Sequence, residues 1–449
     1  MRSFYNNDTV MKKAICSLIL GTVGVMAVHA EVPSAMAITN ARVVTVSGPV
    51  LPRANIVMRN GLIEAVADNA PIPADAWVID GEGLTIYPGL IDGLSTLGII
   101  DASAIGGGGG RRGGGGGGAN SGTPARGPED RPSTTSWLRA ADLVKPSDSR
   151  IETARNAGFT TSITFPTRGI FAGQGAVINL AGSKPGQMLI TSPVGQYVSL
   201  AFSNFNGYPG SLLGVFAYIR QIYLDADHYK LAKEMYARNP SGISRPEYDR
   251  ALEGVMESPR VLLPASRTVD IDRMIHFAAE LKISPVLYGV PKGYTAAERI
   301  AKAGVPVLVS LKWPERRRDS DPDAPETLET LKLRDEAPST PKALAAAKVK
   351  FGFYSDGLEK PADIVKAVRR AIDAGLSADD AIRAFTLSTA EIFGVADRLG
   401  SIEKGKIANL VVTKGNLFET NTKIQYVVID GVKFQPTPEP PPPPAEETN

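Results

Sequence analysis

The stretch PGLIDGLSTLG, Pro88 to Gly98, marks a boundary between two kinds of sequence. Before it, residues 38–86 form short β-rich runs separated by turn residues. Asn60-Gly61 lies between two of these alternating apolar runs, which is a strong hairpin signal. After it, β-rich runs alternate with helical patterns. The stretch is itself predicted to be a strand, and it opens the alternating part of the chain.

The alternating part predicts an α/β fold. Its β-rich runs are nearly continuous in apolar residues, and they lie at 159–165, 260–265, 284–289, 305–311 and 350–356. Between them, residues 269–282 and 295–304 place apolar side chains on one helical face. Buried strands separated by helices indicate a parallel sheet covered by helices. The length of residues 86–394 favours a closed eight-stranded (β/α)8 barrel, a TIM barrel, over an open sheet.

The two ends of the chain are predicted to form one accessory β-domain. Residues 408–415 and 424–434 are again short β-rich runs, the second with an Asp430-Gly431 turn. They match the runs before residue 86, so residues 31–85 and 395–435 are expected to form a small β-sandwich. Residues 436–449 form a proline-rich tail, and residues 106–136 a glycine-rich loop.

The N-terminus resembles an export signal. Lys12 and Lys13 precede an apolar run, residues 14–27, and small residues at 28–30 suit a signal peptidase. The run is shorter than the roughly 20 residues that a membrane span needs, and no other segment approaches that length. We therefore expect residues 1–30 to be removed and the protein to be periplasmic or secreted.

Composition excludes several classes of function. Without residues 1–30 the basic and acidic side chains balance, so nothing favours binding to nucleic acid. The only cysteine, Cys16, lies in the predicted signal, which leaves no thiol nucleophile, disulfide or cysteine metal ligand. The glycine run contains GxGxxG only because any glycine run does, and no helix follows it to hold a phosphate.

Several segments together resemble the amidohydrolase superfamily, nearest its imidazolonepropionase-like and dipeptidase-like branch. They are PGLID at 88–92, ARNAGFTTSIT at 154–164, FGFYSDG at 351–357 and AIRAFTLSTAEIFGVADRLGSIEKGKIANLVV at 381–412. The resemblance implies a distorted (β/α)8 barrel with a split β-sandwich. It also implies hydrolysis of carbon–nitrogen bonds by a metal-bound hydroxide, because a divalent ion lowers the pKa of bound water to about 7.

The resemblance also implies where the metal ligands would lie, and most are replaced. The His-x-His of the first barrel strand falls on Leu94 and Thr96. The histidines of strands five and six fall near Pro264 and on Tyr288 or the adjacent glycine. Asp356 keeps the carboxylate of strand eight and is the candidate catalytic residue. Asn409 replaces an aspartate that the family usually has, outside the site.

The remaining histidines do not restore a metal site. Besides His29 in the predicted signal, the chain has only His228 and His276, both on helical patterns, where surface or packing roles are expected. A catalytic zinc site normally uses three protein ligands, so no metal or other cofactor is expected. Lys312, at the end of the preceding strand, is the candidate counter-ion of Asp356. The alternative for Asp356 is a turn or a helix cap.

Two functions remain open. In the first, the protein is a catalytically degenerate relative that binds a small molecule, a peptide or a partner such as an intact amidohydrolase. In the second, it is an active hydrolase with a non-standard site around Asp356, Tyr288 and Lys312. A divalent metal such as zinc is expected only in this second case.

Overall fold

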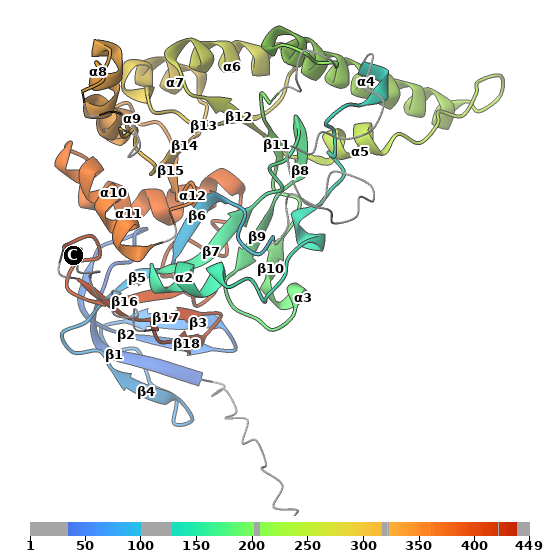
Figure 1. Ribbon diagram of the computed structural model, residues 1–449. Coiled ribbons are helices and arrows are strands. Elements are labelled where there is room, and N and C mark those ends of the chain that lie inside the picture. Colours follow the sequence, from blue (N-terminus) through green and yellow to red (C-terminus); the bar gives the residue numbers. More distant parts are fainter. Residues whose placement is uncertain are drawn as a thin grey trace, which may run out of the picture. The chain divides into compact units, whose positions relative to one another are not determined.

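A computed structural model describes residues 35–99, 128–201, 207–316, 321, 323–358, 360–420 and 422–437 (Figure 1). The predicted export signal, most of the glycine-rich loop and most of the proline-rich tail lie outside these ranges, and those predictions stay untested. All the elements below belong to one unit, Ser34–Asn449. Within the described ranges, no helix has the length and apolar character needed to cross a membrane.

Strands from both ends of the chain join in one eight-stranded sheet. In Figure 1 the blue strands β1 to β5 lie beside the red strands β16 to β18. The order is β18-β17-β16-β5-β1-β2-β3, and β4 also pairs with β1. Their bounds are β1 Ala35–Val43, β2 Leu51–Arg59, β3 Leu62–Ala67, β4 Trp77–Asp80, β5 Thr85–Pro88, β16 Leu410–Lys414, β17 Lys423–Ile429 and β18 Val432–Phe434.

The predicted turns form tight hairpins. Asn60 and Gly61 between β2 and β3, and Asp430 and Gly431 between β17 and β18, all have positive φ, from 50° to 78°. Such paired values are typical of the two-residue turns that match the twist of antiparallel strands. A Cβ on Gly61 would lie 2.4 Å from Asp430 Oδ1, so the two turns pack against each other and only glycine fits there.

Two further sheets build the middle of the chain. One has the order β10-β9-β7-β6, and the other β15-β14-β13-β12-β11-β8, in which β11 to β15 are parallel. The bounds are β6 Leu90–Ser95, β7 Phe159–Thr164, β8 Phe171–Gln174, β9 Ala176–Asn179, β10 Leu189–Thr191, β11 Gln196–Val198, β12 Val261–Ala265, β13 Pro285–Gly289, β14 Val307–Ser310 and β15 Phe351–Tyr354.

Helices separate most of the parallel strands, as the alternation predicts. They are α2 Arg150–Asn156, α3 Pro185–Met188, α4 Leu212–Arg238, α5 Arg250–Glu257, α6 Thr268–Glu280, α7 Ala297–Ala303, α8 Leu328–Glu336, α9 Thr340–Ala346, α10 Pro361–Asp373, α11 Ala378–Phe385 and α12 Leu387–Phe393. Short 3-10 helices cover Pro128–Asp130, Ala140–Asp142, Gly293–Thr295 and Ala337–Ser339. The α/β class predicted from the alternation is therefore correct.

The finer prediction of a closed eight-stranded barrel is not confirmed. Among the described residues the ladder is interrupted, because β6 does not pair with β15, and β7 pairs with β9 rather than with β8. The predicted sandwich is likewise not confirmed, since the terminal strands pair in a single sheet. The sequence pattern specifies which residues are strands, whereas the choice of neighbour depends on contacts far apart in the chain.

Asn409 connects the terminal sheet to the four-stranded sheet. Its buried amide nitrogen donates to Thr161 Oγ1 at 3.0 Å and to Asn179 Oδ1 at 2.7 Å, and its Oδ1 accepts from the backbone N–H of Asp430 at 2.9 Å. An aspartate here could not donate to two oxygens. The amide therefore suits this position.

Candidate functional site

A cavity of about 360 Å³ lies at the carboxyl ends of β6, β13 and β15. It contains four of the residues singled out from the sequence, Leu94, Thr96, Tyr288 and Asp356. Parallel strands bring their carboxyl ends to one edge of a sheet, and ligands of open α/β sheets bind outside those ends. The volume suits a small molecule.

Asp92 lies at the closest approach of β6 and β15. The adjacent Gly93 has no room for a side chain, because a Cβ there would be 2.8 Å from the carbonyl oxygen of Phe353. Asp92 is 1% exposed and lines the cavity. Its Oδ1 accepts from the backbone N–H of Ser355 at 2.9 Å and its Oδ2 from the Ser355 hydroxyl at 2.6 Å. These two bonds join β6 to the residue that follows β15.

The environment of Asp92 favours its protonated form. Burial raises the pKa of Asp92 to about 6, because an ionised carboxylate loses its hydration there, and the charge of nearby Asp356 adds to the rise. The hydrogen bonds from Ser355 oppose the shift without cancelling it. Asp92 therefore changes charge within one unit of neutral pH.

Three tyrosines line the same cavity. The rings of Tyr197 and Tyr288 stack with centroids 5.2 Å apart and an interplanar angle of 29°, and the Tyr288 hydroxyl donates to the carbonyl oxygen of Val198 at 3.1 Å. Tyr354, the last residue of β15, is the third. Burial raises the pKa of all three hydroxyls, so they stay neutral at physiological pH.

Arg150, the first residue of α2, holds the end of β6. Its Nη1 donates to Thr96 Oγ1 at 3.0 Å, and its Nη2 to the carbonyl oxygens of Thr96 at 2.9 Å and Ile99 at 3.2 Å. It also pairs with Asp148 at 2.7 Å. The Asp148 side chain is 4% exposed and accepts from the backbone N–H of Gly98 at 2.9 Å. Arg150 therefore holds both the side chain and the backbone of Thr96.

The structure brings Asp356 into the cavity, but not Lys312 or Pro264. Asp356 is exposed and follows β15, with its Oδ2 accepting from the Ser310 hydroxyl at 2.7 Å. Lys312 donates its backbone N–H to the same hydroxyl at 3.0 Å, and its exposed side chain is not among the residues around the cavity. No ion pair joins Lys312 to Asp356 in the described part of the chain. Pro264 pairs with Tyr288 across β12 and β13 but does not line the cavity.

These donors do not fit the zinc site that the resemblance implies. Leu94 and Thr96 offer no imidazole, and the tyrosine hydroxyls would have to ionise against raised pKa values to bind a metal. Both oxygens of Asp92 already accept hydrogen bonds. In the ranges that the structure describes, no group of three or more His, Cys, Asp or Glu side chains is arranged to hold a metal ion.

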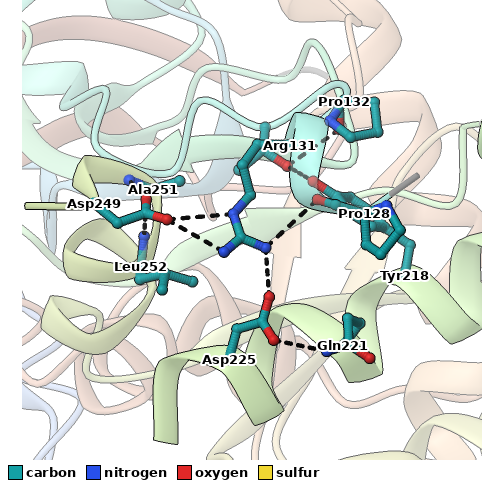
Figure 2. A network of polar contacts seen from close by, with 10 residues as sticks. Pro128, Arg131, Pro132, Tyr218, Gln221, Asp225, Asp249, Ala251 and Leu252 are labelled. Carbon is teal, nitrogen blue, oxygen red and sulfur yellow. Dashed lines mark hydrogen bonds and ion pairs between the residues drawn. The ribbon is translucent and has the colours of Figure 1, made fainter. Parts of the chain in front are cut away.

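The two described histidines lie outside the cavity. His276 is exposed on α6, with Nδ1 2.8 Å from the carbonyl oxygen of Asp272. His228 is exposed on α4 beside a second, more open cavity. Figure 2 shows that Arg131 beside this cavity lies between Asp225 and Asp249, with contacts of 2.5 and 3.2 Å. This arginine joins the chain before β7 to α4 and to the residue that caps α5, and we interpret it as structural.

Sequence reasoning did not assign a role to Asp92 or Arg150. A signal for Asp92 was present, because an acidic residue inside the apolar run LIDGL must be buried, and a buried carboxylate needs hydrogen-bond donors. No comparable signal existed for Arg150. Its role depends on Thr96 and Ile99, and no sequence pattern links those residues to α2.

The second half of the chain matches a known family. Residues 244–433 match the profile described as the amidohydrolase family. The adenine deaminase of Moorella thermoacetica is 44% identical over 64 residues, which are 14% of this chain and 10% of that protein. The match thus spans about a tenth of this relative's length.

Solved structures share the fold over most of the chain. An amidohydrolase from Thermotoga maritima MSB8 matches with a TM-score of 0.72 and 24% identity, covering 89% of this chain and 100% of that chain. A prolidase complexed with N-methylphosphonate-L-proline matches with a TM-score of 0.52 and 16% identity, covering 90% and 100%. At these identities the likeness concerns the fold alone.

Proposed function

We propose that this chain, whose residues 244–433 match the amidohydrolase family, binds a small molecule in its cavity and has lost metal-dependent hydrolysis. The observation that carries the proposal is the set of side chains at the carboxyl end of β6. The resemblance assigns Leu94 and Thr96 to the positions of the two histidines, both line the cavity, and Arg150 donates to Thr96. A metal ion would then find no imidazole ligand among these side chains.

Metal content and turnover test this proposal. We expect the purified protein, incubated with zinc or manganese and then desalted, to contain far less than stoichiometric metal in elemental analysis. We also expect no metal-dependent turnover of cyclic imides, dipeptides or adenine. Stoichiometric metal together with metal-dependent hydrolysis would show that the proposal is wrong.

A second function is favoured by one observation, the presence of Asp92 and Asp356 in one cavity. The pKa of Asp92 is raised to about 6, and carboxylates in unlike environments can serve as general acid and general base. The protein would then hydrolyse carbon–nitrogen bonds without a metal. Turnover that persists in EDTA and disappears in Asp356→Asn would select this function. Absence of turnover in EDTA would exclude it.

Two finer features are proposals of the same kind. We propose that the four- and six-stranded sheets are two parts of one distorted (β/α)8 barrel, supported by the Asp92–Ser355 hydrogen bonds and the likeness to the Thermotoga amidohydrolase. We also propose export and cleavage after residue 30. The N-terminal sequence of the protein recovered from the periplasm or medium tests the cleavage.

The proposed partner, an intact amidohydrolase, rests on the resemblance alone. Size-exclusion chromatography with light scattering of the protein co-expressed with such a relative tests it. Co-elution as a complex of defined mass would support the proposal, and separate elution would contradict it.

A further inference from the structure

We infer that the cavity binds a cation, an amine or guanidine group carried on an apolar or aromatic body. This inference rests on the proposed ligand-binding function and adds the class of ligand. It follows from three properties of the cavity: an unneutralised carboxylate, an arginine whose charge is already paired, and a set of neutral aromatic side chains.

The charge of the cavity is the first property. Two carboxyl side chains and one basic side chain are among the described residues that line it, Asp92, Asp356 and Arg150. Arg150 is paired with Asp148, which is not among the lining residues, and it also donates to Thr96 and Ile99. The arginine therefore does not neutralise the cavity. Among the described lining residues, an anionic ligand would meet no basic side chain other than Arg150, for which it would compete with Asp148.

Asp356 supplies the negative charge. Its carboxylate accepts one hydrogen bond, from Ser310, and no ion pair to it is found in the described part of the chain. A carboxylate oxygen can accept more than one hydrogen bond, so acceptor capacity remains on a group that lines the cavity. An ammonium or guanidinium group of a ligand could donate to this carboxylate. Such a charge-assisted hydrogen bond is about twice as strong as a neutral one.

The aromatic side chains suit the same ligand. Tyr197, Tyr288 and Tyr354 line the cavity, and the bond from Tyr288 to Val198 fixes the stacked pair. An aromatic ring attracts a cation within about 6 Å of its centre, and the attraction is larger where water is excluded. Leu94 and Phe159 also line the cavity and offer apolar surface to the rest of the ligand.

Two matched series of probes test the inference. The first consists of benzylamine, benzyl alcohol and benzoate, and the second of butylamine, butanol and butyrate, each titrated by calorimetry into the full-length mature protein. We expect the amine to bind about tenfold or more tightly than its alcohol, the difference that one charge-assisted hydrogen bond gives. The carboxylate should bind most weakly.

The variant Asp356→Asn should remove the preference for the amine and leave the affinity for the alcohol unchanged. Asp335→Asn, at an exposed position on α8, is the matched control and should bind as the wild type does. Because Asp356 is exposed, the variant should fold, which its circular dichroism and melting temperature would verify.

The outcomes separate the two proposals. Equal binding of amine and alcohol, or an Asp356→Asn variant that keeps the preference, would overturn the cation inference and leave ligand binding intact. If no member of either series binds, both proposals fall. Amine binding together with metal-dependent turnover would overturn only the proposed loss of hydrolysis.

Discussion

The variant Asp92→Asn is expected to be more stable than the wild-type protein at pH 8, by up to about 3 kcal/mol, and equally stable near pH 4. The pKa of Asp92 in the folded protein is about 6, against 3.8 for the ordinary group. One unit of pKa difference corresponds to about 1.4 kcal/mol. Ionising the buried carboxylate therefore costs free energy that an amide does not.

The pH dependence follows from which state binds the proton more tightly. Between pH 3.8 and 6 the folded protein holds a proton on Asp92 that the unfolded chain has lost. Stability therefore falls as the pH rises through this window. The full contribution of Asp92 to folding is present below pH 3.8, and it is lost above pH 6. Asparagine resembles the protonated acid at every pH, so its advantage should grow between pH 3.8 and 6 and stay constant above pH 6.

The hydrogen bonds of Asp92 survive the substitution. The amide oxygen of asparagine can accept from the Ser355 N–H, and its nitrogen can donate to the Ser355 hydroxyl, which also accepts. Urea unfolding of both proteins from pH 4 to pH 8 is the measurement, with Asp335→Asn as control. A variant less stable than the wild type at every pH would refute this account of the site.

The variant Arg150→Met is expected to lower the free energy of unfolding at pH 7 by about 3 kcal/mol, the lower end of the range for breaking a buried ion pair. Asp148 would keep its charge at 4% exposure with only backbone donors left. The Thr96 and Ile99 carbonyl oxygens would also lose a donor. The arginine is 32% exposed, so in the variant water can take the place of some of its hydrogen bonds. We therefore expect a loss at the lower end of the range.

A double variant separates charge from packing. Burial opposes ionisation of Asp148, but hydrogen bonds from Arg150 hold the pKa of Asp148 below its ordinary value. The pair therefore stabilises the fold at neutral pH, and this stabilisation is lost as the pH falls. Asp148→Asn combined with Arg150→Met should recover part of the loss, since no unpaired charge remains. Arg245→Met, at an exposed position, is the control. Losses that simply add would mean that the two side chains are not coupled.

Local features of the fold could be predicted, whereas the pairing of strands could not. Asn60-Gly61 and Asp430-Gly431 specify their turns through backbone preferences of a few residues, and the runs at 260–265 and 350–356 are strands because they are short and apolar. The strands β8 and β9 show the limit, because they are neighbours in the sequence and yet belong to different sheets.

The site shows the same division. Leu94, Thr96, Tyr288 and Asp356 could be predicted to lie together because strand ends meet at one edge of a parallel sheet. The partner of Asp356 could not be predicted, since Ser310 on β14 takes the position expected for Lys312. Lys312 lies beyond the end of β14, where the alternation of strand faces no longer predicts the direction of a side chain. Contacts such as that of Arg150 with Thr96 depend on the packed fold.

The pairing of Pro88 in β5 with Leu410 in β16 has a consequence for synthesis. During synthesis β5 is made early. Its neighbour β16 follows more than three hundred residues later in the chain and leaves the ribosome only then. Until then one edge of β5 offers unpaired N–H and C=O groups, which favour aggregation. Final assembly must therefore follow translation, and a premature stop codon before residue 410 should yield an insoluble product.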